Sequence, residues 1–389
     1  MKTIAIFFGG RSAEHDVSVV TAHIPIIQSL EAAGGFDIWP VYIAKDGSWY
    51  ADKAFNDLAY FRQSDYEAKL GNLKKVGLSF DQGLQLFWTG LRSKTVNIDV
   101  AFPAMHGTYG EDGTLMGLLR LADIPFVGCD LEASAIAMDK VLAKQATEPL
   151  GIPSVPYVWF TGSDWKDDKT TQLKRAGKMR YPLFVKPVHL GSSIAITKVD
   201  KPAELENAIE VALHYDDKVI VEQGVTDLIE VTLPVIGHRE IELGYVEQPL
   251  ATFFGFEEKY LKGGGKKGTG GVNSLYSNIP AKISTKLISR VEELGRQTYR
   301  AIGASGISRI DFLIDGKTEQ VYMNEINTLP GSLYHHNWQQ KGVSGVDLVT
   351  KLVAFAEERY AEQKAKTYTF ASDIINKASG PKTGPPRQA

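Results

Sequence analysis

A short apolar segment at residues 3–8 (TIAIFF) ends at Gly9-Gly10, and apolar residues at helical spacing follow over 17–33. An apolar run without alternation is typical of a strand buried on both faces, and two glycines allow a sharp turn into the next element. A strand, a glycine turn and a helix in this order begin an open α/β sheet. The sequence therefore predicts an α/β fold for the first part of the chain.

Length and charge narrow the class of protein. The chain has 389 residues, and at about 150 residues per domain this length predicts two to three domains. Its 43 lysines and arginines nearly balance 46 acidic residues, giving a formal charge of −3, and no basic block stands out. A broad electrostatic surface for nucleic acid or anionic membrane is therefore not expected. Small-molecule chemistry is the favoured interpretation.

The chain carries one cysteine, Cys129, so it cannot form an intramolecular disulfide or a cysteine-based metal cluster. The opening residues MKTIAIFFGG resemble a first strand more than a signal peptide. No apolar run reaches the roughly 18 residues that span a bilayer. We expect a cytoplasmic enzyme without membrane insertion.

The order of the predicted strands and helices divides the chain into three parts and a tail. In the first part, a strand over 96–104 leads into HGTYGEDG, and residues 50–95 are interpreted as an irregular insertion or extra hairpin. In the second, a helix over 133–151 is followed by strands at 157–160, 182–187, 193–199 and 218–223, a polar loop at 162–172 and a helix at 203–214. The third part contains strands at 228–237 and 240–246, a helix at 284–302, a hairpin within 307–331 and a helix at 347–365. The predicted boundaries are 1–130, 131–225 and 226–366, and the Gly/Pro/Lys-rich residues 378–389 are expected to be a disordered tail.

The hairpin sequence ISRIDFLIDGKTEQVYMNEINTLPG carries the strongest chemical signal. Alternation places Arg309 and Asp311 on one face of the first strand, and Glu325 and Asn327 on one face of the second. With the turn centred near Thr318, Asp311 lies opposite Glu325. Two opposed carboxylates repel each other unless a cation lies between them, and Mg²⁺ prefers carboxylate and amide oxygens. The apolar residues Ile310, Phe312, Ile314, Met323 and Ile326 face the other way and fix this register. A solvated sheet face with an Arg–Asp pair is the alternative interpretation.

The segment FVKPVHLGSS places Lys186 at the end of an apolar strand, before a glycine-serine turn. Lys186 and the backbone amides of Gly191, Ser192 and Ser193 can contact phosphates, and Lys140 adds a second lysine. The segment is not a Walker A loop, so P-loop phosphoryl transfer is not expected. An exposed lysine on a plain hairpin is the alternative.

Two further segments have a chemical and an ordinary interpretation. The loop 256–273 contains six glycines and four lysines, and it is interpreted either as a lid that excludes water or as a linker. Glu14 lies near a predicted helix start, where it can hold an ammonium group or cap the helix. Gly9-Gly10 after the first strand do not continue into G-x-G-x-x-G, which argues against a nicotinamide dehydrogenase. The motifs H-E-x-x-H and G-x-S-x-G are absent, which argues against a zinc site and a serine hydrolase.

Seven segments in order resemble the D-alanine-D-alanine ligase family of the ATP-grasp superfamily: GGRSAEHDVS, HGTYGEDGTLMG, AMDK, FVKPVHLGSS, EKYL, RIDF and NEINTLPG. The resemblance covers about Met1 to Glu362. It implies an ATP-grasp fold, with an N-terminal open α/β domain and two α+β subdomains. It also implies a cytoplasmic homodimer that joins two D-alanines with ATP and Mg²⁺ or Mn²⁺, with two ions, for peptidoglycan synthesis.

The resemblance also implies roles for individual residues. Substrate-binding roles fall to Glu14, His106, Arg309, Gly331 and His336. The residues that the resemblance implies to contact ATP are Lys140, Lys186, Ser192, Ser193, Glu222, Glu230, Lys259, Asn324 and Glu325. Catalytic roles fall to Glu14, Ser192, Tyr260, Arg309 and Gly331, and metal ligation to Asp311, Glu325 and Asn327. Glu14 would bind the first ammonium, while Arg309 and the Gly331 backbone would stabilise the tetrahedral intermediate.

The chain departs from the family pattern at three places, which are His336, the neighbours of Glu230 where the family has a Gly-Arg-Glu run, and the unusually polar glycine-lysine loop after EKYL. His336 stands where a family serine or threonine reads the second substrate's carboxylate. Two other interpretations therefore stay open, a ligase with a different second substrate and a nucleotide-binding regulator without catalysis. Lys259-Tyr260 favours an amine as the second nucleophile, because ester-forming relatives commonly carry a different lid residue.

Overall fold

The computed structural model describes residues 1–81, 83–90, 93–250 and 277–377. Its first sheet has the strand order β3-β2-β1-β7, and β1 pairs in parallel with both β2 and β7. The strands are β1 (Lys2–Gly9), β2 (Phe36–Ile43), β3 (Trp49–Ala51) and β7 (Val100–Pro103). The predicted α/β start is confirmed.

The helix expected at 17–33 is a helical segment in three parts, α1 (His15–Thr21), η1 (Ala22–Ile27) and α2 (Gln28–Ala33). The middle part is a π-helical turn that contains Pro25, which has no N–H to donate to an α-helical hydrogen bond. Before α1, Gly9 has a φ of +88°, and a Cβ there would lie 2.3 Å from the Ile43 carbonyl oxygen. Only glycine fits this turn.

The strand predicted at 96–104 is wrong, because the chain changes sheet within it. Residues 50–97 form η2 (Lys53–Asn56), η3 (Leu58–Tyr60), α3 (Tyr66–Leu70) and an antiparallel sheet of β4 (Gly77–Ser79), β5 (Gln85–Trp88) and β6 (Lys94–Asn97). At the change, Ile98 N–H donates to the Leu84 carbonyl, and the Asp99 carboxylate accepts the Thr3 N–H at 2.7 Å. The extra-hairpin interpretation of 50–95 is close to this three-stranded sheet.

The helix predicted at 133–151 is broken at Asp139. After α4 (Thr114–Leu121), the chain forms α5 (Leu131–Met138), α6 (Lys140–Thr147) and η4 (Glu148–Leu150). Asp139 has extended backbone angles, and its carboxylate caps α6 by accepting the N–H groups of Val141 and Leu142. A capping aspartate favours a new helix start over continuation.

The second sheet is antiparallel, with the order β10-β9-β11-β8, and consists of β8 (Tyr157–Thr161), β9 (Leu183–Pro187), β10 (Thr197–Val199) and β11 (Lys218–Gln223). The predicted polar loop at 162–172 is wrong, because α7 (Gly162–Asp167) and α8 (Lys169–Ala176) occupy it, capped by Thr161 and Asp168. The strand predicted at 193–199 begins only at Thr197. Ser192, Ser193 and Ala195 before it have left-handed φ values of 54°, 59° and 55°. After η5 (Pro202–Glu204), the predicted helix is α9 (Leu205–Tyr215).

The third sheet has the order β13-β12-β16-β17. Its strands are β12 (Leu228–Gly237), β13 (Ile241–Leu243), β16 (Gly306–Asp315) and β17 (Val321–Asn327), with a small pair of β14 (Gln248–Pro249) and β15 (Ser277–Asn278) beside it and α11 (Thr285–Ala301) on its apolar face. The predicted strand at 240–246 is shortened to three residues. The loop 256–273, with Lys259 and Tyr260, and the tail 378–389 lie outside the described residues.

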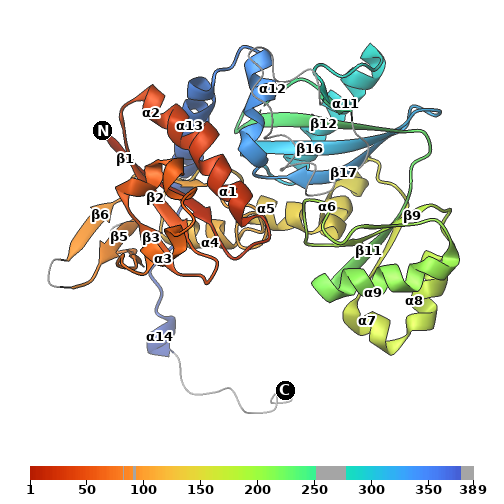
Figure 1. The fold of residues 1–389 in the computed structure, drawn as a ribbon, viewed down its shortest axis with the longest axis horizontal. Coiled ribbons are helices and arrows are strands. Elements are labelled where there is room, and N and C mark those ends of the chain that lie inside the picture. The colour runs from red at the N-terminus through yellow and green to blue at the C-terminus, as the bar shows by residue number, and fades with distance from the viewer. Residues whose placement is uncertain (82, 91–92, 251–276, 378–389) are drawn as a thin grey trace.

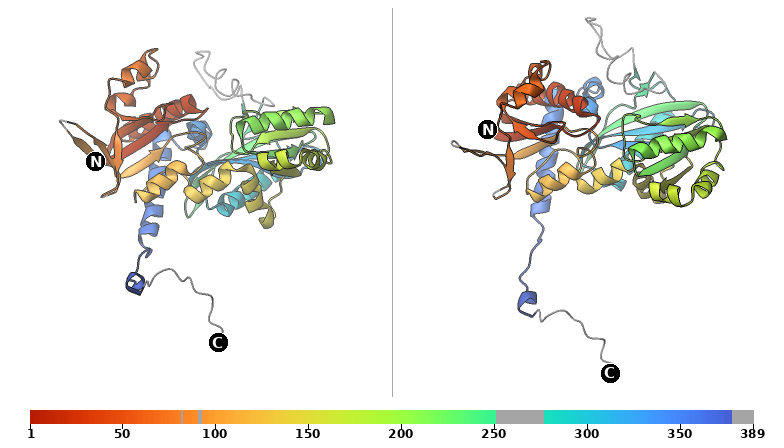
Figure 2. Two further views of the ribbon diagram at one scale, coloured as in Figure 1. Left: turned by 90° about the horizontal axis from the view of Figure 1, so that it is seen from below. Right: turned by 60° about the horizontal axis from the view of Figure 1, so that its bottom comes forward.

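The C-terminal elements return to the first sheet. They are η7 (Gly331–Tyr334), α12 (His335–Gln340), α13 (Gly345–Lys364) and α14 (Ile374–Lys377). Leu348, Val349, Leu352 and Val353 of α13 join the core of the first sheet, and Figure 1 shows α13 beside α2. Figure 2 shows α5 and α6 running between the first sheet and the other two, while α14 lies apart from the body. Among the described residues, no helix is long and apolar enough to cross a membrane.

Candidate active site

One face of the third sheet collects the predicted polar residues. Arg309 pairs with Asn327 and Asp311 with Glu325, which confirms the predicted register for these pairs, whereas the pairs nearer the turn are shifted by one residue. On the other side of β16, β12 brings Thr232 opposite Asp311, and Glu230 lies two residues before Thr232 on the same face. The apolar residues of these strands face α11 instead. The sheet therefore presents an amide, a guanidinium and several carboxylates toward the rest of the molecule.

The pairing shifts by one residue directly after this group. Asp311 pairs with Glu325 but Phe312 pairs with Met323, so Asn324 is the extra residue of a β-bulge. The sequence contained the signal, because Met323 and Ile326 are three residues apart yet both were predicted to be apolar-facing. The bulge brings the Asn324 amide oxygen to 3.4 Å from the Lys186 Nζ on β9, which makes a direct contact between two sheets.

Arg309 and Asp311 form a two-pronged ion pair. Arg309 Nε donates to Asp311 Oδ1 at 2.7 Å, Nη2 donates to Oδ2 at 2.6 Å, and Asn327 Nδ2 donates to Oδ2 at 3.3 Å. Burial alone would lower the pKa of Arg309, but the Asp311 carboxylate raises it well above its usual value. The guanidinium also lies 5.4 Å from the centre of the Tyr334 ring. Arg309 is therefore a fixed positive charge with a defined orientation.

Glu14 contacts the glycine-serine turn from the first domain. Its carboxylate accepts a hydrogen bond from the Ser192 hydroxyl and makes no side-chain cap on α1, so the capping interpretation is wrong. Glu14 is 7% exposed. A Cβ on Gly107 would lie 2.8 Å from the Glu14 Oε2, so the 106–113 loop also approaches this carboxylate closely.

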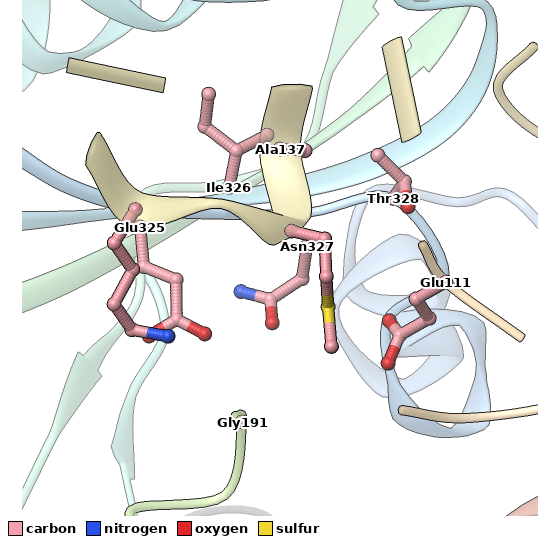
Figure 3. Close-up of a pocket in the computed structure, with 9 residues that line it drawn as sticks. Glu111, Ala137, Gly191, Glu325, Ile326, Asn327 and Thr328 are labelled. Atoms are coloured by element: carbon pink, nitrogen blue, oxygen red, sulfur yellow. The ribbon is translucent and has the colours of Figure 1, made fainter. Parts of the chain in front are cut away.

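A small cavity of about 20 Å³ lies between these groups, lined by Glu111, Lys140, Gly191, Glu325 and Asn327 among others. Figure 3 shows Glu325 and Asn327 pointing toward Gly191, with Glu111 on the far side of Asn327 from Glu325. Burial first, and then the negative charges of Glu14 and Glu325, raise the pKa of Glu111 to about 8. Glu111 is therefore mostly protonated near pH 7, because a further negative charge beside Glu14 and Glu325 is unfavourable.

These observations fit a divalent cation. A cavity of this size has room for one water-sized occupant. Carboxylate and amide oxygens are the ligands that Mg²⁺ prefers, and a cation would relieve the repulsion that raises the pKa of Glu111.

Lys186 and Lys144 hold one buried carboxylate between them. Lys186 Nζ lies 2.5 Å from Glu222 Oε2, and Lys144 Nζ lies 2.8 Å from Oε1. Burial alone would raise the pKa of Glu222, but the two ammonium groups outweigh it and lower the pKa to about 2. The stabilisation this gives is present above the ordinary pKa near 4.5 and is lost as the pH falls through about 2. Glu222 therefore orients both lysines.

We expect Lys144→Met to destabilise the protein by about 3 kcal/mol, because it removes one partner of a buried ion pair. Lys144 is fully buried, and Glu222 would keep only Lys186. Urea unfolding measures the change. Lys169→Met is the matched control, since Lys169 pairs with Glu206 and Glu210 at the surface and its loss should change stability little. Equal effects of the two substitutions would show that the buried Lys144–Glu222 pair does not stabilise the protein more than a surface pair does.

Lys140 approaches the same turn from the start of α6. Its Nζ donates to the Leu190 carbonyl at 2.7 Å, and its backbone N–H contacts the Val188 carbonyl at 3.4 Å. Gly191, Ser192 and Ser193 follow directly, and both serines are left-handed. The predicted phosphate-contacting lysine and turn therefore touch each other.

His106 is joined to the turn after β17. His106 Nε2 lies 2.8 Å from the Thr21 hydroxyl, which also accepts the Ser332 N–H at 3.1 Å. Burial lowers the pKa of His106 to about 4, so the ring is neutral near pH 7. Gly331 and Ser332 are thereby held next to the first domain.

His336 pairs with a buried carboxylate. Its Nε2 lies 3.0 Å from Glu247 Oε2, and Asn337 Nδ2 donates to the same oxygen at 3.1 Å. The His336 ring lies 4.7 Å from the Tyr334 ring, which connects it to Arg309. Burial alone would raise the pKa of Glu247, but its contacts with His336 and Asn337 lower it.

The described structure thus brings most predicted residues into two adjoining groups. One joins Glu14, Ser192, Lys140 and the cavity, and the other joins Lys186, Glu222 and Asn324. The sequence interpretation missed Glu111, Lys144, Glu247, Tyr334 and Thr21. For Lys144 there was a signal, because it lies four residues after Lys140 on the same helix face. Glu111 lay within the segment HGTYGEDG, but nothing in that segment indicated its proximity to Glu14.

An N-terminal open sheet is followed by two α+β units, one carrying Lys186 and the other carrying Arg309, Asp311, Glu325 and Asn327. This is the ATP-grasp fold, in which ATP-dependent ligases activate a carboxylate. Solved structures agree. The D-alanine-D-alanine ligase of Coxiella burnetii matches with a TM-score of 0.77 and 28% identity, covering 94% of this chain and 96% of that one. The VanG D-Ala:D-Ser ligase of Enterococcus faecalis matches with a TM-score of 0.75 and 32% identity, covering 91% and 99%.

Sequence comparison gives the family. The models for the D-ala D-ala ligase N-terminus and C-terminus match residues 3–129 and 146–354. D-alanine–D-alanine ligase of Thermosipho africanus is 32% identical over 380 residues, covering 97% of this chain and 99% of the relative. That of Bacillus velezensis is 35% identical over 375 residues, covering 93% and 100%. The chain belongs to the D-alanine–D-alanine ligase family.

Proposed function

We propose that this protein joins two D-alanines to D-alanyl-D-alanine with ATP, for peptidoglycan precursor synthesis. The observation that supports this proposal most strongly is that one sheet face holds Arg309, Asp311, Glu325 and Asn327. Lys186 of the neighbouring sheet contacts Asn324 of the same hairpin. The enzyme is further proposed to work in the cytoplasm as a homodimer. We also propose that the domain boundaries lie after residues 130 and 225.

ATP is proposed to bind between the second and third sheets. Lys140, Lys186 and the amides of the Gly191–Ser193 turn would contact phosphates, since Lys140 contacts this turn through the Leu190 carbonyl and Lys186 lies on the neighbouring strand β9. Glu222 orients Lys186, and Glu230 on β12 of the third sheet is proposed to contact ATP as well. Lys259 and Tyr260 are proposed to belong to the lid over this site.

Asp311, Glu325 and Asn327 are proposed to be the residues that would hold Mg²⁺ or Mn²⁺, with two ions in the loaded enzyme. Such ions neutralise charge on the transferred phosphoryl group. Arg309 stabilises negative charge beside them, because Asp311 fixes the direction of its guanidinium.

The reaction is proposed to run in two transfers. The carboxylate of the first D-alanine, whose ammonium Glu14 binds, attacks the γ-phosphorus and releases ADP, which leaves an acylphosphate. The amine of the second D-alanine then attacks the acyl carbon, and Arg309 with the Gly331 amide stabilises the oxyanion. Loss of the amine proton and of inorganic phosphate completes the peptide bond. Exclusion of water protects the acylphosphate between the two transfers.

The test is ADP release with magnesium-ATP and D-alanine, with products identified by mass spectrometry. D-Alanyl-D-alanine formed in equal amount to ADP is the expected result. L-alanine, D-lactate and D-serine serve as comparison substrates. Tight ATP binding without ADP release across this panel would support the regulator and contradict the ligase.

A second candidate is a ligase that adds a different second substrate, such as D-serine. It is favoured by the His336–Glu247 pair near Arg309, and a relative named as a D-Ala:D-Ser ligase matches the chain. If His336 restricts the second site, His336→Ser should raise kcat/KM for D-alanine about tenfold, which corresponds to about 1.4 kcal/mol. His335→Ser is the matched control, since His335 is the neighbouring half-buried histidine. An unchanged preference in His336→Ser would contradict this second candidate.

A further inference from the structure

His189 lies between two carboxylates that are almost fully buried. Its Nδ1 is 2.9 Å from Asp216 Oδ1, and its Nε2 is 3.3 Å from Asp139 Oδ2. The side chains of Asp139 and Asp216 are 8% and 5% exposed, whereas that of His189 is 41% exposed. Lys218 Nζ donates to the same Asp139 oxygen at 2.8 Å. Two cationic side chains therefore compensate two buried anions.

The two carboxylates belong to different elements of the nucleotide-binding region. Asp139 separates α5 from α6 and caps the helix that begins with Lys140. Asp216 precedes β11, and it accepts the backbone N–H of His189 at 2.7 Å and that of Lys218 at 3.2 Å. His189 itself lies in the turn that continues into Gly191, Ser192 and Ser193. The imidazole thus joins three segments at one point.

Lys140 contacts this turn from its other side. Its Nζ donates to the carbonyl of Leu190, the residue directly after His189. The turn then passes through the left-handed residues Ser192 and Ser193, a conformation that costs about 1–2 kcal/mol per residue without glycine. Contacts with residues outside the turn must therefore hold it, and the described structure provides them from Lys140, from Glu14, and from Asp139 and Asp216 through His189.

We propose that His189 is a positioning residue for nucleotide binding: its ring, held between Asp139 and Asp216, fixes the turn 188–193 against the start of α6. The distance between the Lys140 amine and the Gly191–Ser193 amides then depends on this contact. His189 touches no substrate and acts through these groups. The inference rests on the proposed use of this turn by ATP.

The charge state of His189 matters, because a neutral imidazole has one N–H and cannot donate to both carboxylates. Hydrogen bonds to Asp139 and Asp216 outweigh burial and raise the pKa of His189 to about 9. The charged groups that face it are Asp139, Asp216, Asp217 and Lys218. A raised pKa means that the double contact is fully present below the ordinary value near 6.5 and is lost as the pH rises through about 9.

The test compares His189→Gln, which removes the charge but keeps one donor, with His189→Arg, which keeps a permanent charge. For His189→Gln we expect the Kd for magnesium-ATP to rise about tenfold, the loss of one charge-assisted hydrogen bond. Amide hydrogen exchange in residues 188–196 should become faster in the same variant. His189→Arg should restore both the Kd for magnesium-ATP and the slow amide exchange. Its ATP affinity should stay the same as the pH rises past 9, whereas that of the wild type should weaken. His214→Gln, an exposed histidine on α9, is the matched control.

Hydrogen exchange is measured on the free protein and therefore does not depend on ligase activity. Unchanged exchange at 188–196, or unchanged ATP affinity, in His189→Gln would overturn the proposal while leaving the ligase function standing. Wild-type protein that binds no ATP would overturn both together. If His189→Gln weakens ATP binding and His189→Arg does not restore it, the shape of the ring, and not its charge, holds the turn. That result would also overturn the proposal.

Discussion

Glu325→Gln is expected to lower kcat by about 10³-fold or more, because it removes the negative charge of a proposed metal ligand. The substitution keeps the size of the side chain and removes one of the charges that raise the pKa of Glu111. The thermal midpoint should therefore stay the same or rise. ADP release and thermal unfolding measure the two effects.

Glu319→Gln provides the control for Glu325→Gln. Glu319 lies at the exposed tip of the same hairpin and pairs with Lys286 on the surface. The Glu319→Gln variant should keep both the activity and the stability of the wild type. If Glu325→Gln retained activity but lost thermal stability, Glu325 would be a structural residue of the sheet and the metal site would have to lie elsewhere.

Arg309→Lys is expected to lower kcat by about 10²-fold to 10³-fold, with a smaller change in KM for ATP. Lysine keeps the positive charge but cannot make the two parallel hydrogen bonds that Arg309 makes to Asp311. The charge would no longer point at the oxyanion. Steady-state kinetics with D-alanine separates kcat from KM.

Lys341→Arg is a useful comparison, because Lys341 donates to the Leu243 carbonyl on β13, away from the site face. It should leave kcat unchanged. If Arg309→Lys raised KM and left kcat unchanged, Arg309 would bind the substrate equally in the ground and transition states. That result would remove Arg309 from the catalytic groups.

Asp311→Asn is a less clean test of the metal site than Glu325→Gln. From the sequence, both substitutions are expected to leave folding intact. The structure changes this expectation for Asp311, since its carboxylate is the partner of the half-buried Arg309. Removing it leaves a cation without compensation, so Asp311→Asn should lower stability as well as activity.

Local sequence patterns predicted the hairpin well. Alternation along each strand and a short turn, both of which are properties of neighbouring residues, predict the polar face, but the pairing of Asp311 with Glu325 also needs the β-bulge at Asn324. The bulge at Asn324 was the one departure, and the spacing of Met323 and Ile326 contained its signal. The placement of Glu14 near a helix start was also local, but its contact with Ser192 was not.

Errors arose where a residue far away decides the local structure. Asp139 breaks the predicted helix at 133–151 and meets Lys218 and His189 at the same point. Asp99 ends a predicted strand because it binds the backbone of Thr3. The predicted polar loop at 162–172 forms two capped helices that pack on the second sheet. In each case a short polar residue has several local conformations, and a tertiary contact selects one.

The sequence by itself determined the α/β class, the order of its elements, the family and the hairpin that carries the proposed metal ligands. These properties depend on periodicity and on ordered short motifs, which a linear chain records. Only the tertiary structure decided that Glu222 is held by Lys144 and Lys186, that Glu111 lies near Glu14 and Glu325, and that His189 joins Asp139 to Asp216. These residues are far apart in sequence, and burial sets the strength of their charges on one another. Neither their distance nor their burial is encoded in any local pattern.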